Sequence, residues 1–430
     1  MHLPYDTIVF DLDGTLTDSR PGIESGIRYA LEQLNRPCPD PDTLRLFLGP
    51  PLAESFMIHC GLSEEEARIA TEHYRKRYVD GGGMFENAVF PGIRPLLKRL
   101  KRDGVRLCVA TGKPMNGTEP ILKQFGLYGL FNAIACPGLN DMHADKAALI
   151  RRCLADDPKG SSARVLMVGD IDGDILGGQR AGTDTCAALW GYGTDVESAH
   201  PTFACRTPFD LYERLYGEKL ERRGYFISLE GLDGCGKTTQ QRLLASTLQQ
   251  NGYETLLTRE PGGCPIAEAV RGILLTKEDT HMRDETEALL FAAARAQHVH
   301  DTIAPAIAEG KVVLCDRFVD SSIAYQGAGR GLGEDWIRQI NRAAGRLPDL
   351  TIYVRLSAQE AIRRRFREDS PDRIEQSGAA FFERTEKAFD RLAAQETDRF
   401  VTVDGNGSIE EIAGAIARAV LPRVEAALAP

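Results

Sequence analysis

With 430 residues, the chain is too long for one ordinary hydrophobic core, so roughly two or three domains are expected. Its 43% hydrophobic and 27% charged residues are typical of a globular protein and exclude a low-complexity or disordered chain. The net charge of −10 argues against a surface that coats nucleic acid, although local basic pockets and small phosphorylated ligands are compatible with it.

Cysteine usage and hydropathy favour a cytoplasmic protein. The ten cysteines include no CxxC pair and no Cys/His cluster, which indicates free thiols in a reducing compartment. The first residues, MHLPYDTIVF, lack the basic and apolar segments of a signal peptide. No apolar run approaches the ~20 residues that a membrane span requires. We therefore expect neither a membrane nor a nucleic acid as a partner.

Short apolar runs that end in acidic or glycine-rich turns predict the strands of two parallel sheets. Helical patterns lie between most of these runs, which is the rhythm of α/β domains with helices wrapped around a sheet. In chain order, the predicted strands cover residues 5–10, 106–112, 164–170, 224–231, 254–260, 311–317 and 350–356.

One interval of the chain departs from this rhythm. Between Ser19 and Phe90 every pattern is helical, so residues about 19–88 are interpreted as a helical cap inserted after the first strand. The segment 207–223 contains no Gly/Ser-rich linker and is expected to form one helix that joins the two halves. The domains are accordingly expected over residues 1–218 and 219–430.

The first candidate site begins directly after the first predicted strand, in FDLDGTLTDS (residues 10–19). Asp11 and Asp13 project to the same side there, at the edge where parallel sheets build active sites, and Gly14 allows a tight turn. Taken alone, this stretch is also compatible with a DxDG turn that caps a strand, or with a calcium-like loop.

Further polar groups at strand ends and helix starts favour a catalytic site. Thr111 ends the second predicted strand, Lys146 begins a helix, and Asp170 and Asp174 follow the third strand. Phosphoryl transfer to an aspartate requires such a set. One carboxylate attacks phosphorus, a second acid/base protonates the leaving oxygen, and Mg²⁺ with a lysine neutralises the phosphoryl charge. Asp11 and Asp170 would then be metal ligands.

This combination of DxDGT, Thr, Lys and GDxxxD resembles the phosphoglycolate-phosphatase-like branch of the haloacid-dehalogenase superfamily, over residues 5 to about 205. The resemblance implies that Asp11 is the nucleophile and Asp13 the general acid/base. It assigns Thr111 and Lys146 to the phosphoryl group, with Lys146 preferred to Lys113, which lies beside Thr111. The Mg²⁺ site would draw on Asp11, Asp13, Asp170 and Asp174.

The substrate of this half is not determined by its motifs. FLGPPLAESF (residues 47–56) resembles the cap loop of that branch, whose members include phosphoglycolate phosphatases, 5′-nucleotidases and pyrophosphatases. Arg20 and Arg45 are candidates for a substrate anion, and solvated charges on the cap explain them equally well.

The second candidate site is GLDGCGKT (residues 231–238), which matches the phosphate-loop pattern GxxxxGK[ST] between a strand and an amphipathic helix. Its glycines let backbone N–H groups turn toward phosphates, Lys237 reaches across them, and Thr238 can ligate Mg²⁺. The loop alone is compatible with a GTPase, an ATPase or a kinase. The residues expected to contact the nucleoside triphosphate are Gly231, Asp233, Gly234, Cys235, Gly236, Lys237, Thr238 and Thr239.

Three stretches downstream favour a kinase for a pyrimidine monophosphate: TREPGG (258–263), LLFAAARAQH (289–298) and CDRFVDSSIAYQGAGRG (315–331). An aromatic ring can stack on the base, an amide can hydrogen-bond its edge, and arginines can hold its phosphate. Phe291 taken singly is more often a core residue, but Arg295 lies four residues away on the same helix face and favours base stacking.

These stretches closely match bacterial thymidylate kinases over residues 224 to about 425. The resemblance implies a P-loop nucleoside-monophosphate kinase fold, ATP as phosphoryl donor and dTMP as acceptor, with Phe291 stacked on thymine. Asp233 would meet the sugar hydroxyl beside Glu260, and Asp316 would support Mg²⁺. Such kinases are commonly homodimers. The other implied dTMP contacts are Arg295 and Gln326 at the base edge with Ser322 nearby, and Arg259, Arg271 and Arg317 at the phosphate.

The basic run AIRRRFREDSPDRIEQ (residues 361–376) corresponds to the lid of that family. It is compatible with a solvated face, or with a mobile arginine that closes on the transferred phosphoryl group. Because the phosphate loop carries no arginine, the resemblance assigns the catalytic arginine to the lid. Glu368 and Asp369 depart from the commoner spacing. The candidates, in order of match, are Arg373, Arg367 and Arg364.

The sequence therefore predicts a bifunctional α/β enzyme. A Rossmannoid parallel sheet with an inserted helical cap would form a Mg²⁺-dependent phosphomonoester hydrolase, and a thymidylate kinase would follow it. Because a dTMP phosphatase would oppose the kinase, another phosphate ester, such as a different nucleotide, is favoured. Two alternatives stay open: a phosphoglycolate phosphatase unrelated to the kinase, and a regulatory module of it.

Overall fold

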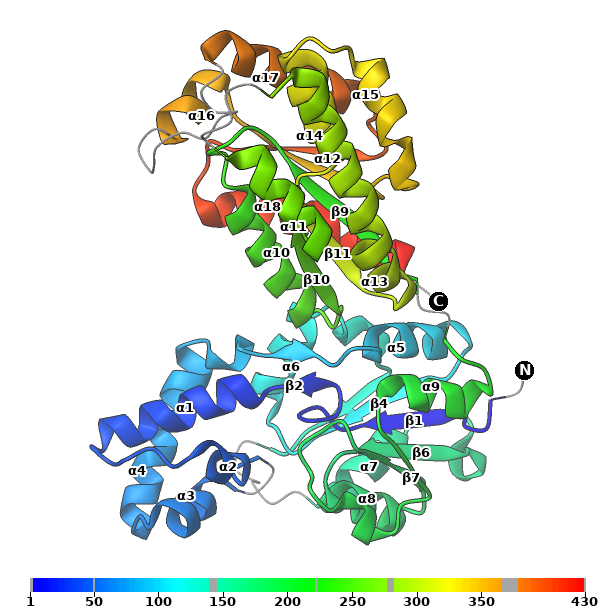
Figure 1. Cartoon of the computed structure of the whole chain (residues 1–430). Coiled ribbons are helices and arrows are strands. Elements are labelled where there is room, and N and C mark those ends of the chain that lie inside the picture. The colour runs from blue at the N-terminus through cyan, green and yellow to red at the C-terminus, as the bar shows by residue number, and fades with distance from the viewer. Residues whose placement is uncertain are drawn as a thin grey trace. The chain divides into compact units, whose positions relative to one another are not determined.

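The computed structural model describes residues 3–48, 51–138, 145–220, 223–276, 282–365 and 378–428 (Figure 1). Packing divides the chain into two compact units, with the boundary between Glu221 and Arg222. Each unit contains a parallel sheet with helices packed on it, so the predicted α/β architecture is confirmed. Among the described residues, no helix combines the length and the apolar character that crossing a membrane requires.

The first unit is built on a six-stranded parallel sheet with the order β5-β4-β1-β6-β7-β8. The central strand β1 (Thr7–Phe10) pairs with β4 (Arg106–Ala110) and β6 (Val165–Gly169), and all of its residues are buried. Its run TIVF is continuously apolar or β-branched because helices cover both faces of the sheet. The outer strands are β5 (Ala133–Ala135), β7 (Asp184–Ala188) and β8 (Phe203–Cys205).

Helices cover the two faces of this sheet. On one face α5 (Ile93–Arg102) contacts α9 (Pro208–Tyr216), and on the opposite face α7 (Lys146–Leu154) contacts α8 (Asp172–Ala181) (Figure 1). Helix α6 (Met115–Gln124) lies between β4 and β5 in the chain.

The prediction of one continuous helix over residues 207–223 is wrong in its second half. Thr207 begins α9, because its hydroxyl accepts a hydrogen bond from the Asp210 backbone N–H at 3.1 Å. The helix ends at Tyr216, because Gly217 adopts the left-handed conformation with φ 70° and caps it. The sequence contained this stop signal in the glycine itself.

The chain between β1 and α5 is helical, as expected from its pattern. Its ends are joined by a short antiparallel pair, β2 (Thr17–Asp18) with β3 (Ala88–Val89), which the sequence analysis did not anticipate. A π-helical turn over Lys76–Asp80 and a 3-10 turn over Gly83–Phe85 precede β3. The helices of this segment are α1 (Arg20–Gln33), α2 (Pro41–Arg45), α3 (Leu52–Cys60) and α4 (Glu64–Arg75).

The second unit contains a five-stranded parallel sheet with the order β10-β11-β9-β12-β13. The central strand β9 (Tyr225–Glu230) lies between β11 (Val312–Asp316) and β12 (Leu350–Arg355). The edges are β10 (Thr255–Arg259) and β13 (Phe400–Asp404). Because the strands are parallel, the residues that follow β9, β10 and β11 meet at one edge of the sheet.

The helical segments of the second unit that carry candidate site residues are α10 (Lys237–Gln250), α11 (Pro265–Leu275), α12 (Asp284–His298), α14 (Val319–Ser322) and the π-helical η7 (Ile323–Gly329). The others are α13 (Ala304–Ala308), α15 (Glu334–Ile340), α16 (Ala358–Arg365), α17 (Ala379–Gln395) and α18 (Ile409–Ala427).

Every strand predicted from an apolar run is present, whereas β5, β7, β8 and β13 were not predicted. Strands β5 and β8 have three residues each, and β7 is rich in alanine, so none of them produces a long β-branched run. In strand β13, FVTVD, the last four residues alternate apolar and polar side chains, which is a strand signal present in the sequence.

A buried ion pair ties α14 to the sheet of the second unit. The fully buried Asp320 accepts hydrogen bonds from Arg399 Nη1 at 2.7 Å, Arg399 Nη2 at 2.9 Å and the Thr351 hydroxyl at 3.1 Å. Removing the arginine would leave a buried carboxylate without its cation, which is far costlier than losing an exposed pair.

We therefore expect Arg399→Met to lower the free energy of unfolding of the second unit by about 3–5 kcal/mol. The matched control is Arg355→Met, which removes an arginine paired with Asp390 but 56% exposed, and should cost less than about 1 kcal/mol. Urea unfolding followed by Trp336 fluorescence, in a Trp190→Phe background, reports this unit alone. Equal effects of the two substitutions would contradict the role given to burial.

Candidate active sites

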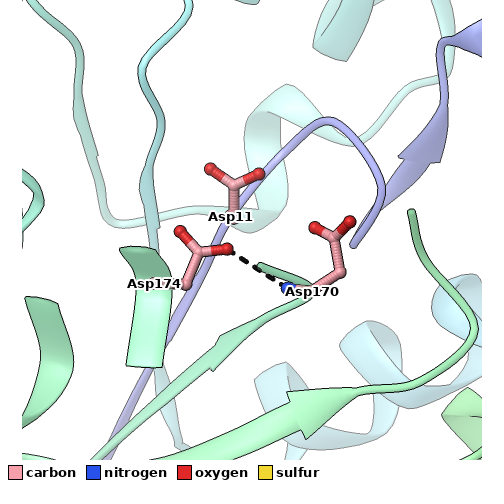
Figure 2. Close-up of side chains that lie close together, drawn as sticks. All are labelled: Asp11, Asp170 and Asp174. Atoms are coloured by element: carbon pink, nitrogen blue, oxygen red, sulfur yellow. Dashed lines mark hydrogen bonds between the residues drawn. The ribbon is translucent and has the colours of Figure 1, made fainter. Parts of the chain in front are cut away.

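Three carboxylates of the first unit converge at the carboxyl edge of its sheet. Asp11 follows β1, Asp170 follows the adjacent β6, and Asp174 lies in the first turn of α8, as Figure 2 shows. Their nearest oxygens all lie within 4.8 Å of one another. The three residues are 8%, 1% and 0% exposed, respectively. Gly14 leaves room for this approach, because a Cβ there would lie 2.1 Å from Asp170 Oδ2.

The Lys146 ammonium lies beside this cluster. From the first residue of α7, its Nζ lies 2.6 Å from Asp11 Oδ1 and 2.7 Å from Asp174 Oδ1, and it donates to the Ala110 carbonyl at 2.9 Å. Burial lowers the pKa of Lys146, but the two carboxylates outweigh burial and raise it above its ordinary value. The lysine is therefore a permanent cation here.

Hydrogen bonds orient the carboxylates of this cluster. Asp170 accepts from the Thr15 hydroxyl at 2.9 Å and from the Tyr192 backbone N–H at 2.8 Å. Asp174 Oδ2 accepts from the Asp170 backbone N–H at 3.1 Å (Figure 2) and from the Ile171 backbone N–H at 3.3 Å. These donors fix the orientations of both carboxylates.

One lysine does not neutralise three buried carboxylates. Burial raises the pKa of Asp11 to about 7, with Lys146 opposing the shift and Asp174 adding to it. Burial, then Asp174 and Asp11, raise the pKa of Asp170 well above its ordinary value. Carboxylate oxygens are the ligands that Mg²⁺ prefers, and a divalent cation would remove the repulsion. Asp11, Asp170 and Asp174 thus fit a divalent-cation site.

Asp13, expected among the metal ligands, lies outside this cluster. Its Oδ2 lies 3.2 Å from Lys113 Nζ, and the same ammonium donates to the Tyr78 hydroxyl at 2.8 Å. Thr111 is buried near this contact, and its hydroxyl accepts from the Lys113 backbone N–H at 3.1 Å. Lys146, rather than Lys113, is therefore the lysine that contacts Asp11.

The two cap arginines proposed for a substrate anion each have an acidic neighbour. Arg20 lies 3.4 Å from Asp18, and Arg45 lies 3.8 Å from Asp42. Both side chains are substantially exposed, so these contacts fit solvated charges as well as a substrate role.

In the second unit, the phosphate loop lies between β9 and α10. Gly231, Gly234 and Gly236 have φ values of 140°, 82° and 89°, which L-residues with a side chain rarely adopt. The buried Lys237 donates from Nζ to the Gly231 carbonyl at 3.1 Å and to the Leu232 carbonyl at 2.9 Å. Its ammonium is thus held at the loop by neutral acceptors, which an anion would replace.

Two oxygen ligands for a divalent cation meet beside this loop. The Thr238 hydroxyl, in the first turn of α10, donates to Asp316 Oδ2 at 2.5 Å, and Asp316 is the last residue of β11. A hydroxyl and a carboxylate next to a phosphate loop fit Mg²⁺ bound together with phosphate oxygens.

Arg317 links the phosphate loop to η7. It has a positive φ of 69° and donates to the Gly231 carbonyl at 3.0 Å and to Asp233 Oδ1 at 2.5 Å. The Tyr325 hydroxyl donates to the other oxygen of Asp233 at 2.9 Å. Burial raises the pKa of Asp233, but Arg317 and Lys237 outweigh burial and hold it well below its ordinary value. Asp233 is therefore a fully charged, rigidly held acceptor.

A cavity of about 800 Å³ extends from the phosphate loop to α12. It brings together every residue that the sequence analysis assigned to the acceptor, and most of the phosphate loop. Gly231 and Cys235 do not line it, and Cys235 is buried. The acceptor residues that line it are Asp233, Arg259, Glu260, Arg271, Phe291, Arg295, Arg317, Ser322 and Gln326, and the loop residues are Gly234, Gly236, Lys237, Thr238 and Thr239.

Arg295 is held in one position by buried acceptors. Its Nε donates to Glu260 at 2.5 Å, its Nη1 donates to the Ser322 hydroxyl at 3.1 Å and to Asn341, and its Nη2 donates to the Phe318 carbonyl at 3.2 Å. Only 2% of its surface is exposed. A guanidinium fixed in this way presents its remaining donor in one direction.

Arg259 and Arg271 also line the cavity. Arg259 Nη2 lies 3.0 Å from Glu268, and Arg271 Nη1 donates to the Pro261 carbonyl at 2.8 Å. Arg259 is 55% exposed at its side chain, so it can turn toward an anion with little loss of packing.

Sequence reasoning missed Tyr325, His298 and Asn341. Tyr325 lines the cavity and lies next to Gln326 in the stretch quoted for the second site. His298 and Asn341 are buried, and His298 Nδ1 lies 3.1 Å from Glu260. No pattern in the sequence places Asn341 near Arg295, whereas His298 is the last residue of the same helix.

The lid candidates are only partly within the described structure. Arg364 donates from Nε to Glu360 at 2.8 Å and from Nη1 to the Gly405 carbonyl at 3.0 Å. Arg367 and Arg373 lie outside the described residues. The assignment of a lid arginine stays a prediction.

Each unit matches a different family of known proteins. The family model "Thymidylate kinase" matches residues 229–416, and the model "Haloacid dehalogenase-like hydrolase" matches residues 8–188. The thymidylate kinase of Geobacter sulfurreducens is 48% identical over 212 residues, which cover 47% of this chain and 98% of that protein. The thymidylate kinase of Exiguobacterium sibiricum is 46% identical over 200 residues, which cover 46% of this chain and 94% of that protein.

One solved structure similar to part of this chain is a haloacid dehalogenase-like family hydrolase from Streptococcus pneumoniae. It is 30% identical, and the match covers 49% of this chain and 98% of that chain with a TM-score of 0.45. The two family models confirm the resemblances at the level of a haloacid dehalogenase-like hydrolase and a thymidylate kinase.

The carboxylate cluster predicts that Mg²⁺ stabilises the first unit against unfolding. Mg²⁺ at 100 times its dissociation constant should stabilise the first unit by about 2.7 kcal/mol. Asp170→Asn should abolish this gain, and in EDTA it should raise the melting temperature, because it removes one of three mutually repelling buried charges. Trp190 fluorescence in a Trp336→Phe background follows this unit, since Trp190 donates to the Thr15 carbonyl beside the cluster.

The matched control for this experiment is Asp172→Asn, an exposed carboxylate in the same helix turn, which should keep the full Mg²⁺ effect. An undiminished Mg²⁺ shift in Asp170→Asn would contradict the site.

Proposed function

We propose that this chain, which belongs to the thymidylate kinase family through residues 229–416 and carries a haloacid dehalogenase-like hydrolase domain at residues 8–188, has two separate phosphoryl-transfer activities. The second unit transfers the γ-phosphoryl group of ATP to dTMP. The first unit hydrolyses a phosphate monoester through an aspartyl-phosphate. The observation that carries the proposal is that each unit brings together its own set of reactive groups, one around Asp11 and one in the cavity beside Lys237.

In the kinase unit, the chain's task is to align two phosphates and neutralise their charge. Backbone N–H groups of the glycine-rich loop point at the triphosphate, and Lys237 exchanges the Gly231 and Leu232 carbonyls for phosphate oxygens. Thr238 and Asp316 would hold Mg²⁺, which supplies charge neutralisation when bound. Positioning and electrostatic stabilisation, rather than covalent catalysis, account for the acceleration.

The acceptor nucleotide occupies the rest of the cavity. Phe291 is half-buried against the core and exposes its remaining surface to the cavity, which supports stacking on the base. Arg259 and Arg271 can hold the phosphate of dTMP, and Arg317 holds Asp233 toward the sugar. Glu260 acts indirectly by fixing Arg295.

In the phosphatase unit, Asp11 attacks phosphorus and the ester P–O bond breaks as the new Asp11 O–P bond forms. Asp13 gives its proton to the leaving oxygen and then takes a proton from the water that hydrolyses the aspartyl-phosphate. Lys146 and Thr111 hold the phosphoryl oxygens. Asp11, Asp170 and Asp174 would hold Mg²⁺, which supplies further charge neutralisation when bound. The products are the alcohol and inorganic phosphate, and Asp11 is regenerated.

Lys113 orients the proposed general acid, Asp13. It holds one oxygen of Asp13 at 3.2 Å and contacts Tyr78 of the cap at the same time. The orientation of the general acid is therefore linked to the cap. The substrate is proposed to be a phosphate ester other than dTMP, such as another nucleotide, because hydrolysis of dTMP would oppose the kinase.

The independence of the two sites predicts the outcome of Lys237→Ala. This substitution should lower formation of dTDP from dTMP and ATP by at least about 100-fold, because it removes the cation that faces the transferred phosphoryl group. Phosphate release from p-nitrophenyl phosphate should be unchanged. Lys311→Ala, which removes an exposed lysine of the same unit, is the control. Loss of both activities in Lys237→Ala would show that the sites are not separate.

The reciprocal prediction concerns Asp11→Asn, which replaces the nucleophile with a neutral amide. Phosphate release should fall to background, while phosphorylation of dTMP should persist. Phosphate release is assayed on a panel of nucleoside monophosphates, phosphoglycolate, pyrophosphate and sugar phosphates with Mg²⁺, in the Lys237→Ala background so that the kinase does not contribute. Phosphorylation of dTMP is assayed in the Asp11→Asn single variant.

Asp172→Asn serves again as the exposed control. A preference for a nucleotide in the unsubstituted phosphatase site would support the proposed substrate class, whereas a preference for phosphoglycolate would replace it. No phosphate release from any member of the panel would exclude the hydrolase activity.

A further inference from the structure

We propose that Glu287 is a positioning residue that makes the base pocket select thymine over cytosine, by holding the carboxamide of Gln326 in one orientation. This inference rests on the proposed dTMP kinase function of the second unit. Glu287 itself does not line the cavity, and it is fully buried behind Gln326.

One face of α12 supplies three groups to this region. Glu287, Phe291 and Arg295 follow one another at intervals of four residues, so they lie on the same side of the helix. Phe291 and Arg295 reach the cavity directly. Glu287 reaches it through Gln326, which belongs to η7, and whose Nε2 donates to Glu287 Oε1 at 2.9 Å.

The charge of Glu287 determines which end of the amide it binds. Arg330 Nη2 donates to Glu287 Oε2 at 3.2 Å and Arg330 Nε to Oε1 at 3.4 Å, so the buried carboxylate has a cationic partner. An ionised carboxylate only accepts hydrogen bonds. Gln326 must therefore present its NH₂ group to Glu287, because the reverse orientation would place two oxygens against each other.

This orientation leaves the amide oxygen of Gln326 as an acceptor for a ligand. Gln326 lines the cavity, and within the described parts of the chain no hydrogen bond reaches its Oε1. A side-chain amide without Glu287 would be free to turn by half a rotation and offer a donor instead. Glu287 removes that freedom.

Arg295 supplies the complementary donor. A guanidinium has five N–H groups, and those of Arg295 donate to Glu260, Ser322, Asn341 and Phe318, which leaves one at Nη2. The cavity therefore offers one fixed donor and one fixed acceptor at the base. Thymine has an N3–H donor next to its O4 acceptor, whereas cytosine has an N3 acceptor next to its N4 amino donor. The fixed pair matches thymine and opposes cytosine at both positions.

The decisive experiment compares kcat/KM for dTMP, dCMP and dUMP in wild type and in Glu287→Gln. The new glutamine amide can donate or accept, so Gln326 can turn its NH₂ toward cytosine N3. The ratio of kcat/KM for dTMP to that for dCMP should fall by roughly 10-fold or more, since an opposed buried pair otherwise costs about that factor. The ratio of dTMP to dUMP should not change, because both bases present the same N3–H and O4.

Glu285→Gln is the matched control, since it removes an exposed carboxylate two residues earlier on the same helix and should leave both ratios at the wild-type values. Calorimetric binding of dTMP and dCMP in the absence of ATP provides a readout that does not depend on turnover. Its affinity ratio should fall in Glu287→Gln in parallel with the kinetic ratio.

A second variant covers the case in which Glu287→Gln does not fold. Glu287→Asp keeps the negative charge opposite Arg330 but is one methylene shorter, so it loses its reach to Gln326 while the ion pair can persist. The dTMP to dCMP ratio should fall here too. If Glu287 served only to neutralise Arg330, Glu287→Gln would lower activity toward all three nucleotides equally, and Glu287→Asp would keep wild-type activity toward all three.

An unchanged dTMP to dCMP ratio in either folded variant, with active wild type, would overturn the role of Glu287 and leave the kinase assignment intact. Absence of dTMP phosphorylation in the wild-type chain would overturn the proposed function and this inference together.

Discussion

Both sites depend on the cost of burying carboxylates, which hydrogen-bond donors and nearby cations offset. In the second unit Asp233 pairs with Arg317, and Glu260 pairs with Arg295. In the first unit the ammonium of Lys146 contacts Asp11 and Asp174, while Asp170 has hydrogen-bond donors instead. The consequence is a difference in local charge, because the three carboxylates of the first site outnumber the Lys146 ammonium, whereas the second site has fixed cations that face the cavity.

This difference explains what each site is built to receive. A cluster with excess negative charge gains from a divalent cation, and the cation in turn attracts a phosphoryl group. A cavity lined by Arg259, Arg271 and Lys237 attracts phosphates directly. The two units thus attract phosphate groups in different ways, the first through a cation bound by carboxylates and the second through its own basic side chains. Both sites lie on parallel sheets.

The paired carboxylates of the second unit also act as fixed reference points. An arginine that is held by buried acceptors cannot turn to suit a wrong ligand, and an amide that faces a carboxylate cannot turn either. Glu260 acts in this way on Arg295, and Glu287 acts in this way on Gln326. Neither carboxylate is required to contact the base itself. Selectivity for the base therefore depends on the residues that orient the cavity-lining side chains as much as on the lining side chains themselves.

Much of the fold and many of the candidate site residues could be predicted from the sequence, because local patterns specify local structure. Buried strands of parallel sheets are continuous apolar runs, and the motifs at their ends identified Asp11, Asp170, Lys237 and Arg317 as site residues. The short outer strands β5 and β8, and the end of α9 at Gly217, were missed or misplaced because a three-residue strand leaves almost no pattern and one glycine was given too little weight.

The sequence by itself determined the two folds, the separation into two units and the residue types at the strand ends. Only the tertiary structure decided that Asp13 pairs with Lys113 and lies apart from the carboxylate cluster, that Tyr325 holds Asp233, and that Glu287 lies behind Gln326. The reason is physical: strands and helices form from patterns along a few residues, whereas these contacts join segments from 39 to 100 residues apart in sequence. Their partners are chosen by packing, which no local pattern contains.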